Sequence, residues 1–149
     1  MQPDSTFRRG EYAVSALDTA GSRGVIELAG RRVLIVEDEP LIAMALEDVL
    51  LDLGCTIVGR AAGVDDALAS IAQHAIDLAI LDVNIEGGQS YAVADALRDR
   101  GVPFVFTTGA AEDSVDCRYA DNVILRKPFM PMGVVLALRK ALDSARQAG

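Results

Sequence analysis

The chain has 149 residues, of which 51% are apolar, so it suits one domain of ordinary size with a full hydrophobic core. No apolar run approaches the ~18 residues of a membrane-spanning helix, and the first residues lack the pattern of a secretory signal. The formal net charge of −8 argues against a nucleic-acid-binding face, and Cys55 and Cys117 are too far apart for a disulfide framework or a zinc site. Together these features predict a cytoplasmic protein with reduced thiols.

Residues 1–30 differ in composition from the rest of the chain. They are rich in Ser, Thr, Gly and charged residues and have little hydrophobic periodicity. We therefore expect a flexible N-terminal extension over 1–30, followed by a single domain over 31–147.

Five short apolar runs follow, separated by amphipathic stretches. The runs cover 33–36, 56–58, 78–83, 104–108 and 123–125. Most are continuously apolar, which is typical of strands that are covered on both faces. The stretches 41–54, 64–74, 90–101 and 132–147 have helical periodicity. This alternation predicts an α/β fold with a parallel sheet and helices on both sides.

Two details concern the helices. Gly54 and Gly101 directly follow helical patterns and are typical helix C-caps. The segment 110–122 should hold the fourth helix, but it has few large apolar residues. We therefore expect a short, distorted or mobile helix there.

Polar residues stand at the ends of the predicted strands. Glu37 and Asp38 follow the first strand, Asp82 ends the third, and Thr108 ends the fourth. Lys127 follows the fifth strand. Ligands bind beyond the carboxyl ends of parallel strands, so we expect these side chains to converge on one site. A register error of one residue would put Thr107 in place of Thr108.

The chemistry of this site follows from its charges. Three neighbouring carboxylates raise one another's pKa values unless a cation joins them. A site of oxygen ligands without His or Cys suits a hard cation, above all Mg²⁺. Asp82 can then act as a nucleophile toward phosphorus and form an aspartyl phosphate. Lys127 would neutralise charge on the phosphoryl group, and Thr108 would donate a hydrogen bond to it.

Four motifs in this order resemble the response-regulator receiver domain of bacterial two-component signalling. They are "VEDE" at 36–39, "LAILDV" at 78–83, "FTTGA" at 106–110 and "LRKPF" at 125–129. The resemblance implies a flavodoxin-like (βα)5 sheet of strand order 2-1-3-4-5 and a cis bond before Pro128. It implies Asp82 as phosphoacceptor, Thr108 and Lys127 as phosphoryl contacts, and a magnesium shell formed by Glu37, Asp38, Asp82 and the backbone carbonyl of Asn84.

The chain departs from the usual receiver pattern at several positions. "NIEGGQSY" at 84–91 replaces the usual Met-Pro and Asp-Gly pairs, and Ile124 replaces the switch aromatic. "PFVFTTGA" at 103–110 is similar to the Phe-Ala-Thr-Gly signature of stand-alone receivers from alphaproteobacteria. Thr107 stands where that signature has Ala, and Ala111 where it has Tyr.

The expected function is therefore a phospho-accepting signalling module and not an enzyme. A histidine kinase or a histidine phosphotransfer protein would supply the phosphoryl group, and the signal would pass to a downstream protein by contact, since no output domain follows the last helix. Neither a nucleic acid nor a membrane is an expected partner. Two alternatives are a phosphorylation-independent interaction module and the receiver end of a hybrid histidine kinase. A phosphatase of the haloacid-dehalogenase type would need an aspartate at position 84, where this chain has Asn84.

Overall fold

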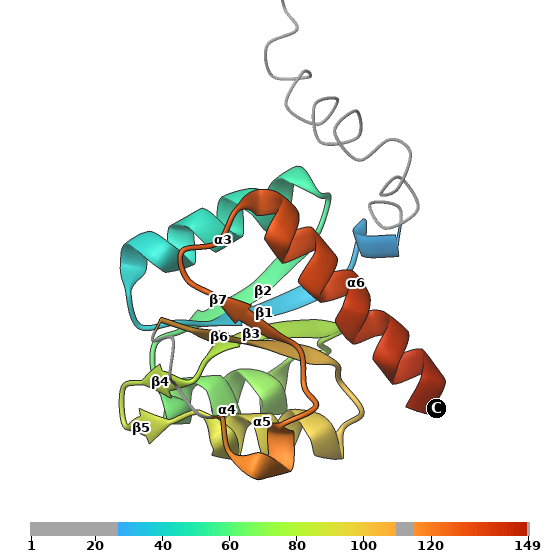
Figure 1. Cartoon of the computed structure of the whole chain (residues 1–149). Helices are drawn as coiled ribbons and strands as arrows, with labels where there is room; N and C mark the ends of the chain where they lie inside the picture. The colour runs from blue at the N-terminus through green and yellow to red at the C-terminus, as the bar shows by residue number, and fades with distance from the viewer. Residues whose placement is uncertain (1–26, 110–114, 149) are drawn as a thin grey trace, which may run out of the picture.

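A five-stranded parallel sheet forms the centre of the computed structural model, which describes residues 27–109 and 115–148 (Figure 1). Its strand order is β2-β1-β3-β6-β7. The strands are β1 (Arg32–Val36), β2 (Thr56–Ala61), β3 (Leu78–Asp82), β6 (Phe104–Thr108) and β7 (Ile124–Arg126). Numbered along the chain, this order is 2-1-3-4-5, so the predicted flavodoxin-like fold is confirmed.

Four α-helices cover the sheet in two layers (Figure 1). Helices α3 (Pro40–Asp52) and α6 (Pro131–Ala148) lie on one face, and α4 (Val64–Gln73) and α5 (Tyr91–Asp99) lie on the other. Successive strand residues point to opposite faces, so each strand supplies both layers. The core against α3 and α6 includes Val33, Ile35, Ile80 and Val105, and the core against α4 and α5 includes Leu34, Val36, Leu81 and Phe106.

Helix α3 begins and ends where the local sequence predicts. Glu39 is the N-cap and Pro40 the first helical residue, a position where the missing proline N–H removes no helical hydrogen bond. Beyond the last residues of α3, Gly54 adopts φ +86°, a conformation that favours glycine. The helical periodicity predicted for 41–54 agrees with the packing, because Leu46 and Leu50 lie on one face of α3 and are fully buried.

The structure differs from the sequence prediction at β2 and after β3. Strand β2 extends to Ala61 because it pairs with β1 along the whole length of β1. The segment after Asp82 forms an unpredicted antiparallel hairpin, β4 (Asn84–Ile85) and β5 (Gly88–Gln89). Gly87 makes its turn possible with φ +90°, and Glu86 hydrogen-bonds through its backbone to Ala62 and Val64. The hairpin thereby joins β3 to the start of α4.

The predicted fourth helix is short in the part that the structure describes. Residues 110–114 lie outside the described ranges, and the following segment contains the three-residue 3₁₀-helix η1 (Cys117–Tyr119). A continuous α-helix would need more apolar residues than this segment has, which is why the chain runs on to β7 after one turn.

Residues 1–26 of the predicted extension also lie outside the described ranges. Nearer the domain, Leu28 is fully buried in the core beside α3 and α6, and Glu27 forms an ion pair with Arg146 at 2.5 Å. The boundary at residue 30 therefore stays a prediction, but residues 27 and 28 already pack against the domain. Over 27–109 and 115–148, every helix is too short or too polar to span a bilayer.

Candidate functional site

Three carboxylates meet where β1 and β3 end. The register pairs Val36 of β1 with Leu81 of β3, so the residues that follow each strand lie side by side. Glu37, Asp38 and Asp82 each offer one carboxylate oxygen, and all three oxygens lie within 4.8 Å of one another. The sheet thus brings together acids that are 45 residues apart in the chain, as the strand-end argument predicts.

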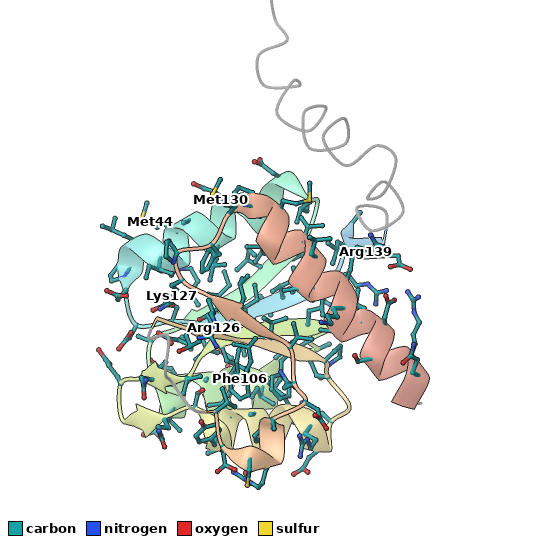
Figure 2. The ribbon with its side chains drawn as sticks, in the orientation of Figure 1. Met44, Phe106, Arg126, Lys127, Met130 and Arg139 are labelled. Atoms are coloured by element: carbon teal, nitrogen blue, oxygen red, sulfur yellow. The ribbon has the colours of Figure 1, made fainter. Side chains whose placement is uncertain are left out.

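Lys127 completes this cluster from the end of β7, two strands away from β3 at the same edge of the sheet. Its Nζ donates a hydrogen bond to Asp82 Oδ2 at 2.9 Å and forms an ion pair with Glu37 Oε1 at 3.0 Å. The carboxylate of Glu39 is more distant, at 3.9 Å, and mostly exposed. Figure 2 labels Lys127 beside Arg126 at the end of the sheet. One ammonium group therefore neutralises part of the charge of two buried acids.

Burial decides how these groups titrate. Burial raises the pKa of Glu37, and the neighbouring Asp82 charge adds to this, so the lowering effect of Lys127 is outweighed. Burial lowers the pKa of Lys127, but its contacts with Asp82 and Glu37 outweigh that, and its pKa is raised. The lysine is therefore protonated at neutral pH, whereas ionised Glu37 lowers the free energy of unfolding.

The two threonines that end β6 are both buried. Thr107 pairs with Asp82 across β3 and β6, and Thr108 pairs with Arg126 of β7. The backbone carbonyl of Thr108 accepts a hydrogen bond from the Lys127 N–H at 2.8 Å. Successive side chains alternate between the faces of a strand, so the two hydroxyls leave the sheet on opposite sides.

Two further expectations concern the surroundings of the site. The bond between Lys127 and Pro128 is cis, as the family resemblance implies. Asn84, whose carbonyl the resemblance assigns to the metal shell, lies in β4 two residues after Asp82. The assignments of Asn84 and Thr108 as ligand-contacting residues stay predictions.

The donor set fits a hard divalent cation. The described acids of the cluster supply oxygen ligands only, and neither the histidine His74 nor a cysteine belongs to the cluster. Glu37 is almost completely buried and its pKa is raised, so a cation placed among these oxygens would relieve a real electrostatic penalty. Glu37, Asp38 and Asp82 are the residues that would hold Mg²⁺.

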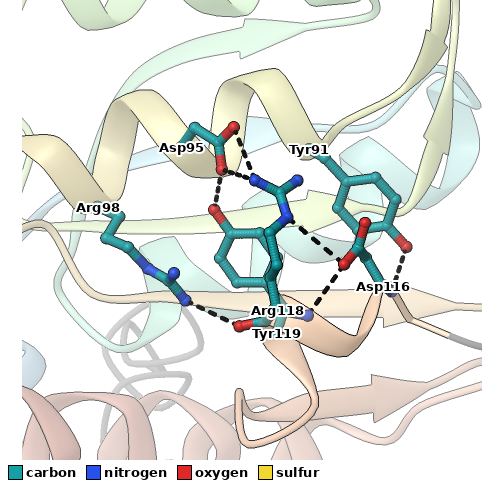
Figure 3. A network of polar contacts seen from close by, with 6 residues as sticks. All are labelled: Tyr91, Asp95, Arg98, Asp116, Arg118 and Tyr119. Atoms are coloured by element: carbon teal, nitrogen blue, oxygen red, sulfur yellow. Dashed lines mark hydrogen bonds and ion pairs between the residues drawn. The ribbon is translucent and has the colours of Figure 1, made fainter.

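A second polar network, which the sequence prediction missed, anchors the segment after the site (Figure 3). Tyr119 of η1 is buried, and its hydroxyl donates a hydrogen bond to Asp95 of α5. Its ring stacks on Tyr91, and the Arg98 guanidinium carbon lies 4.1 Å from its centroid. One signal in the sequence could have indicated this anchor, because Tyr119 is the only aromatic residue in 110–122.

Taken together, the sheet order, the three acids and the lysine define a receiver-type α/β domain with an acidic, magnesium-compatible pocket. The chain belongs to the response regulator receiver domain family, whose model matches residues 33–139. The sequence resemblance to the receiver domain of two-component signalling is thereby confirmed.

Individual relatives support the alphaproteobacterial subgroup. The solution structure of SdrG from Sphingomonas melonis Fr1 is 50% identical with a TM-score of 0.67, and the match covers 80% of this chain and 98% of that one. The receiver domain of PhyR from Erythrobacter litoralis is 30% identical with a TM-score of 0.67, covering 78% of this chain and 93% of that one. The phyllosphere-induced regulator PhyR of Methylorubrum extorquens is 32% identical over 146 residues, covering 88% of this chain and 55% of that protein. The chain thus spans little more than half the length of this curated relative.

Proposed function

We propose that this domain accepts a phosphoryl group on Asp82 from a phosphohistidine donor and passes the signal on by protein contact. The observation that carries the proposal is the contact set of Lys127, which binds Asp82 and approaches Glu37 within 3.0 Å. An acidic pocket in which one lysine contacts the aspartate Asp82 suits phosphoryl transfer. Positioning and charge neutralisation supply most of the catalysis in that reaction.

In the proposed step, an Asp82 carboxylate oxygen attacks phosphorus and forms the O–P bond. The P–N bond of the donor breaks, its electron pair stays on the imidazole nitrogen, and that nitrogen takes up a proton from water. Lys127 would stabilise the negative charge of the transferred oxygens, and Thr108 would donate a hydrogen bond to one of them. Glu37, Asp38, Asp82 and the Asn84 carbonyl would hold Mg²⁺, which would supply the remaining positive charge when bound.

An apolar surface beside the site favours a protein donor. A hollow of about 500 Å³ lies next to Lys127, between the first turn of α3 and the segment after β7. Leu41 is 78% exposed and Met130 is 71% exposed, and Met44, labelled with Met130 in Figure 2, is half exposed. Exposed apolar side chains that cluster near a reactive group mark a contact surface. We propose that the histidine-bearing helix of a histidine kinase or phosphotransfer protein docks here.

The output would pass through a conformational equilibrium that phosphorylation shifts. Among the described residues, the candidate moving parts are the η1 segment and the surface beside β7. The same proposal places the protein in the cytoplasm and gives it protein partners in place of nucleic acid or membrane. It also expects no enzymatic turnover.

The direct test is detection of an aspartyl phosphate. The full chain is incubated with Mg²⁺ and acetyl phosphate, and the intact mass is measured. We expect one phosphoryl adduct in the wild type and none in Asp82→Asn, with circular dichroism showing that the variant is folded. An adduct of equal yield on Asp82→Asn would contradict the assignment of the acceptor.

The alternative with a specific observation behind it is phosphorylation-independent binding. Ile124 is half-buried against the core beside α5, where many receivers carry a switch aromatic. A folded wild type that takes no phosphoryl group from acetyl phosphate, phosphoramidate or a phosphorylated histidine phosphotransfer protein would favour this alternative. Turnover of small phosphate esters would instead point to a phosphatase.

A further inference from the structure

Thr107 carries a hydroxyl group that the proposed mechanism does not use. The residue is completely buried at the end of β6, and its Oγ1 has no hydrogen-bond partner among the residues that the structure describes. Buried hydroxyls are normally paired, because leaving one unpaired destabilises the folded state. An unpaired donor next to a reactive group therefore needs a functional explanation.

The register of the sheet places this hydroxyl beside the phosphoacceptor. Thr107 is the direct partner of Asp82 in the β3–β6 ladder. Two residues earlier, Ile80 and Val105 both face the layer of α3 and α6, so Asp82 and Thr107 leave the sheet on that same side. In-register residues on adjacent strands lie about 5 Å apart, within reach of a hydrogen bond between their side chains.

In this structure Lys127, and not the Thr107 hydroxyl, donates a hydrogen bond to Asp82. Its side chain starts after β7 and must cross the end of β6 to reach β3, since β6 lies between them. The ammonium binds Asp82 Oδ2 at 2.9 Å. When Lys127 turns to a phosphoryl group, the carboxyl of Asp82 loses that donor, and Thr107 is the neighbouring neutral donor.

We propose that Thr107 is a positioning residue of the phosphoacceptor site, whose hydroxyl donates a hydrogen bond to the Asp82 carboxyl oxygen that does not attack phosphorus. The bond fixes the carboxyl plane so that its other oxygen faces the donor. The inference rests on the proposed function, because it assigns a second hydroxyl to that same site.

Three full-length proteins test the inference: wild type, Thr107→Val and Thr107→Ser. Valine keeps the shape of threonine without the hydroxyl, and serine keeps the hydroxyl without the methyl group. The rate of adduct formation with acetyl phosphate and Mg²⁺ is measured by intact mass, and stability is measured by urea unfolding. We expect Thr107→Val to be phosphorylated about tenfold more slowly and Thr107→Ser within about twofold of the wild type.

The two properties should rank the variants in opposite orders. Thr107→Val should be at least as stable as the wild type because it removes an unpaired buried hydroxyl, and Thr107→Ser should be less stable because it leaves a small cavity. A packing role alone would make the serine variant the slower one, and that result would overturn the inference. If Thr107→Val does not fold, Thr107→Ala replaces it with the same expected loss of rate.

The outcome also separates this inference from the proposed function. If the wild type forms an adduct and Thr107→Val forms it equally fast, only the proposed role of Thr107 is overturned. Wild type that forms no adduct with acetyl phosphate, phosphoramidate or a phosphorylated histidine phosphotransfer protein overturns both.

Discussion

A single buried carboxylate, Glu37, accounts for much of the electrostatics at the site. Its side chain is 1% exposed and shares Lys127 with Asp82, so two buried acids depend on one ammonium group. One Glu37 oxygen also accepts a hydrogen bond from the Glu39 N–H at 3.1 Å. These contacts only partly offset the loss of water, which is why the pKa of Glu37 is raised. The charge of Glu37 is therefore held at a cost in stability, which a cation bound beside it would relieve.

We predict that Glu37→Gln melts at a higher temperature than the wild type at pH 7 without Mg²⁺. A carboxyl whose folded pKa is raised contributes stability that is fully present below its ordinary pKa of 4.5 and is lost as pH rises through the folded value. The glutamine variant escapes that loss, so its advantage should shrink as the pH is lowered from 8 to 5. Calorimetry measures the melting temperatures of both proteins over this pH range.

The matched control is Glu39→Gln, which removes a neighbouring but mostly exposed acid. Its melting temperature should differ little from that of the wild type. A Glu37→Gln variant that melts below the wild type at pH 7 would show that the carboxylate stabilises the folded state.

At the scale of elements, η1 is held by side chains more than by backbone structure. It has three residues, and its fixed position depends on Tyr119, which stacks on Tyr91 (Figure 3). The Tyr119 ring also contacts Phe104 and Phe106. Asp116 adds a backbone N–H bond to the Tyr91 hydroxyl at 2.8 Å. The segment that usually forms a helix in receivers is thus attached to α5 through one aromatic cluster.

We predict that Tyr119→Phe lowers the free energy of unfolding by about 1 kcal/mol, because it removes the hydrogen bond to the largely exposed Asp95 but keeps the ring contacts. Tyr119→Ala should lower it by about 3–5 kcal/mol, since a buried aromatic ring is lost. Urea unfolding measures both, and amide hydrogen exchange over 116–122 should accelerate most in the alanine variant. Unchanged exchange there would contradict the anchoring role of Tyr119.

The same residue predicts a dependence on pH at the alkaline end. Burial, together with the bond to Asp95, raises the pKa of Tyr119 to about 12 from its ordinary 10.0. The stability that its protonated hydroxyl contributes is fully present below pH 10 and is lost as the pH rises toward 12. The urea midpoint of Tyr119→Phe should therefore fall less between pH 9 and 11 than that of the wild type. An equal fall in both proteins would exclude Tyr119 as its source.

At the scale of the whole molecule, charge favours cation binding. The chain carries a net charge of −8, and three of its acids share one site with one lysine. A ligand that binds only the folded state stabilises it in proportion to the logarithm of its concentration above Kd. Asp82 ends β3, the central strand of the sheet, so stabilisation by a cation bound there would act on the whole domain.

We predict that 10 mM Mg²⁺ raises the melting temperature of the wild type and that Asp38→Ala loses most of this rise. Asp38 belongs to the acidic cluster but is not the acceptor, so the variant separates metal binding from phosphorylation. Asp99→Ala, at the last residue of α5, removes an exposed acid and should keep the full effect. An undiminished Mg²⁺ effect in Asp38→Ala would place the cation elsewhere.

Patterns along the chain were sufficient to predict the five strands and the meeting of Glu37, Asp82 and Lys127, since continuous apolar runs and strand-end polar residues obey local rules. The sheet order came from the family resemblance. The patterns were not sufficient for the hairpin over Asn84–Gln89, whose pairs depend on a two-residue turn and on backbone bonds to Ala62 and to Val64 at the start of α4. They also missed the end of β2, because pairing with β1 overrides the weak strand preference of Gly59.

The sequence by itself therefore determined which fold this chain adopts and which polar residues stand at the carboxyl edge of its sheet. Only the tertiary structure decided how those residues share their charges. The reach of Lys127 across β6, the burial of Glu37 and the pairing of Thr107 with Asp82 depend on distances between strands that are far apart in the chain. Such distances follow from packing in three dimensions, where burial and charge act through space and not along the chain.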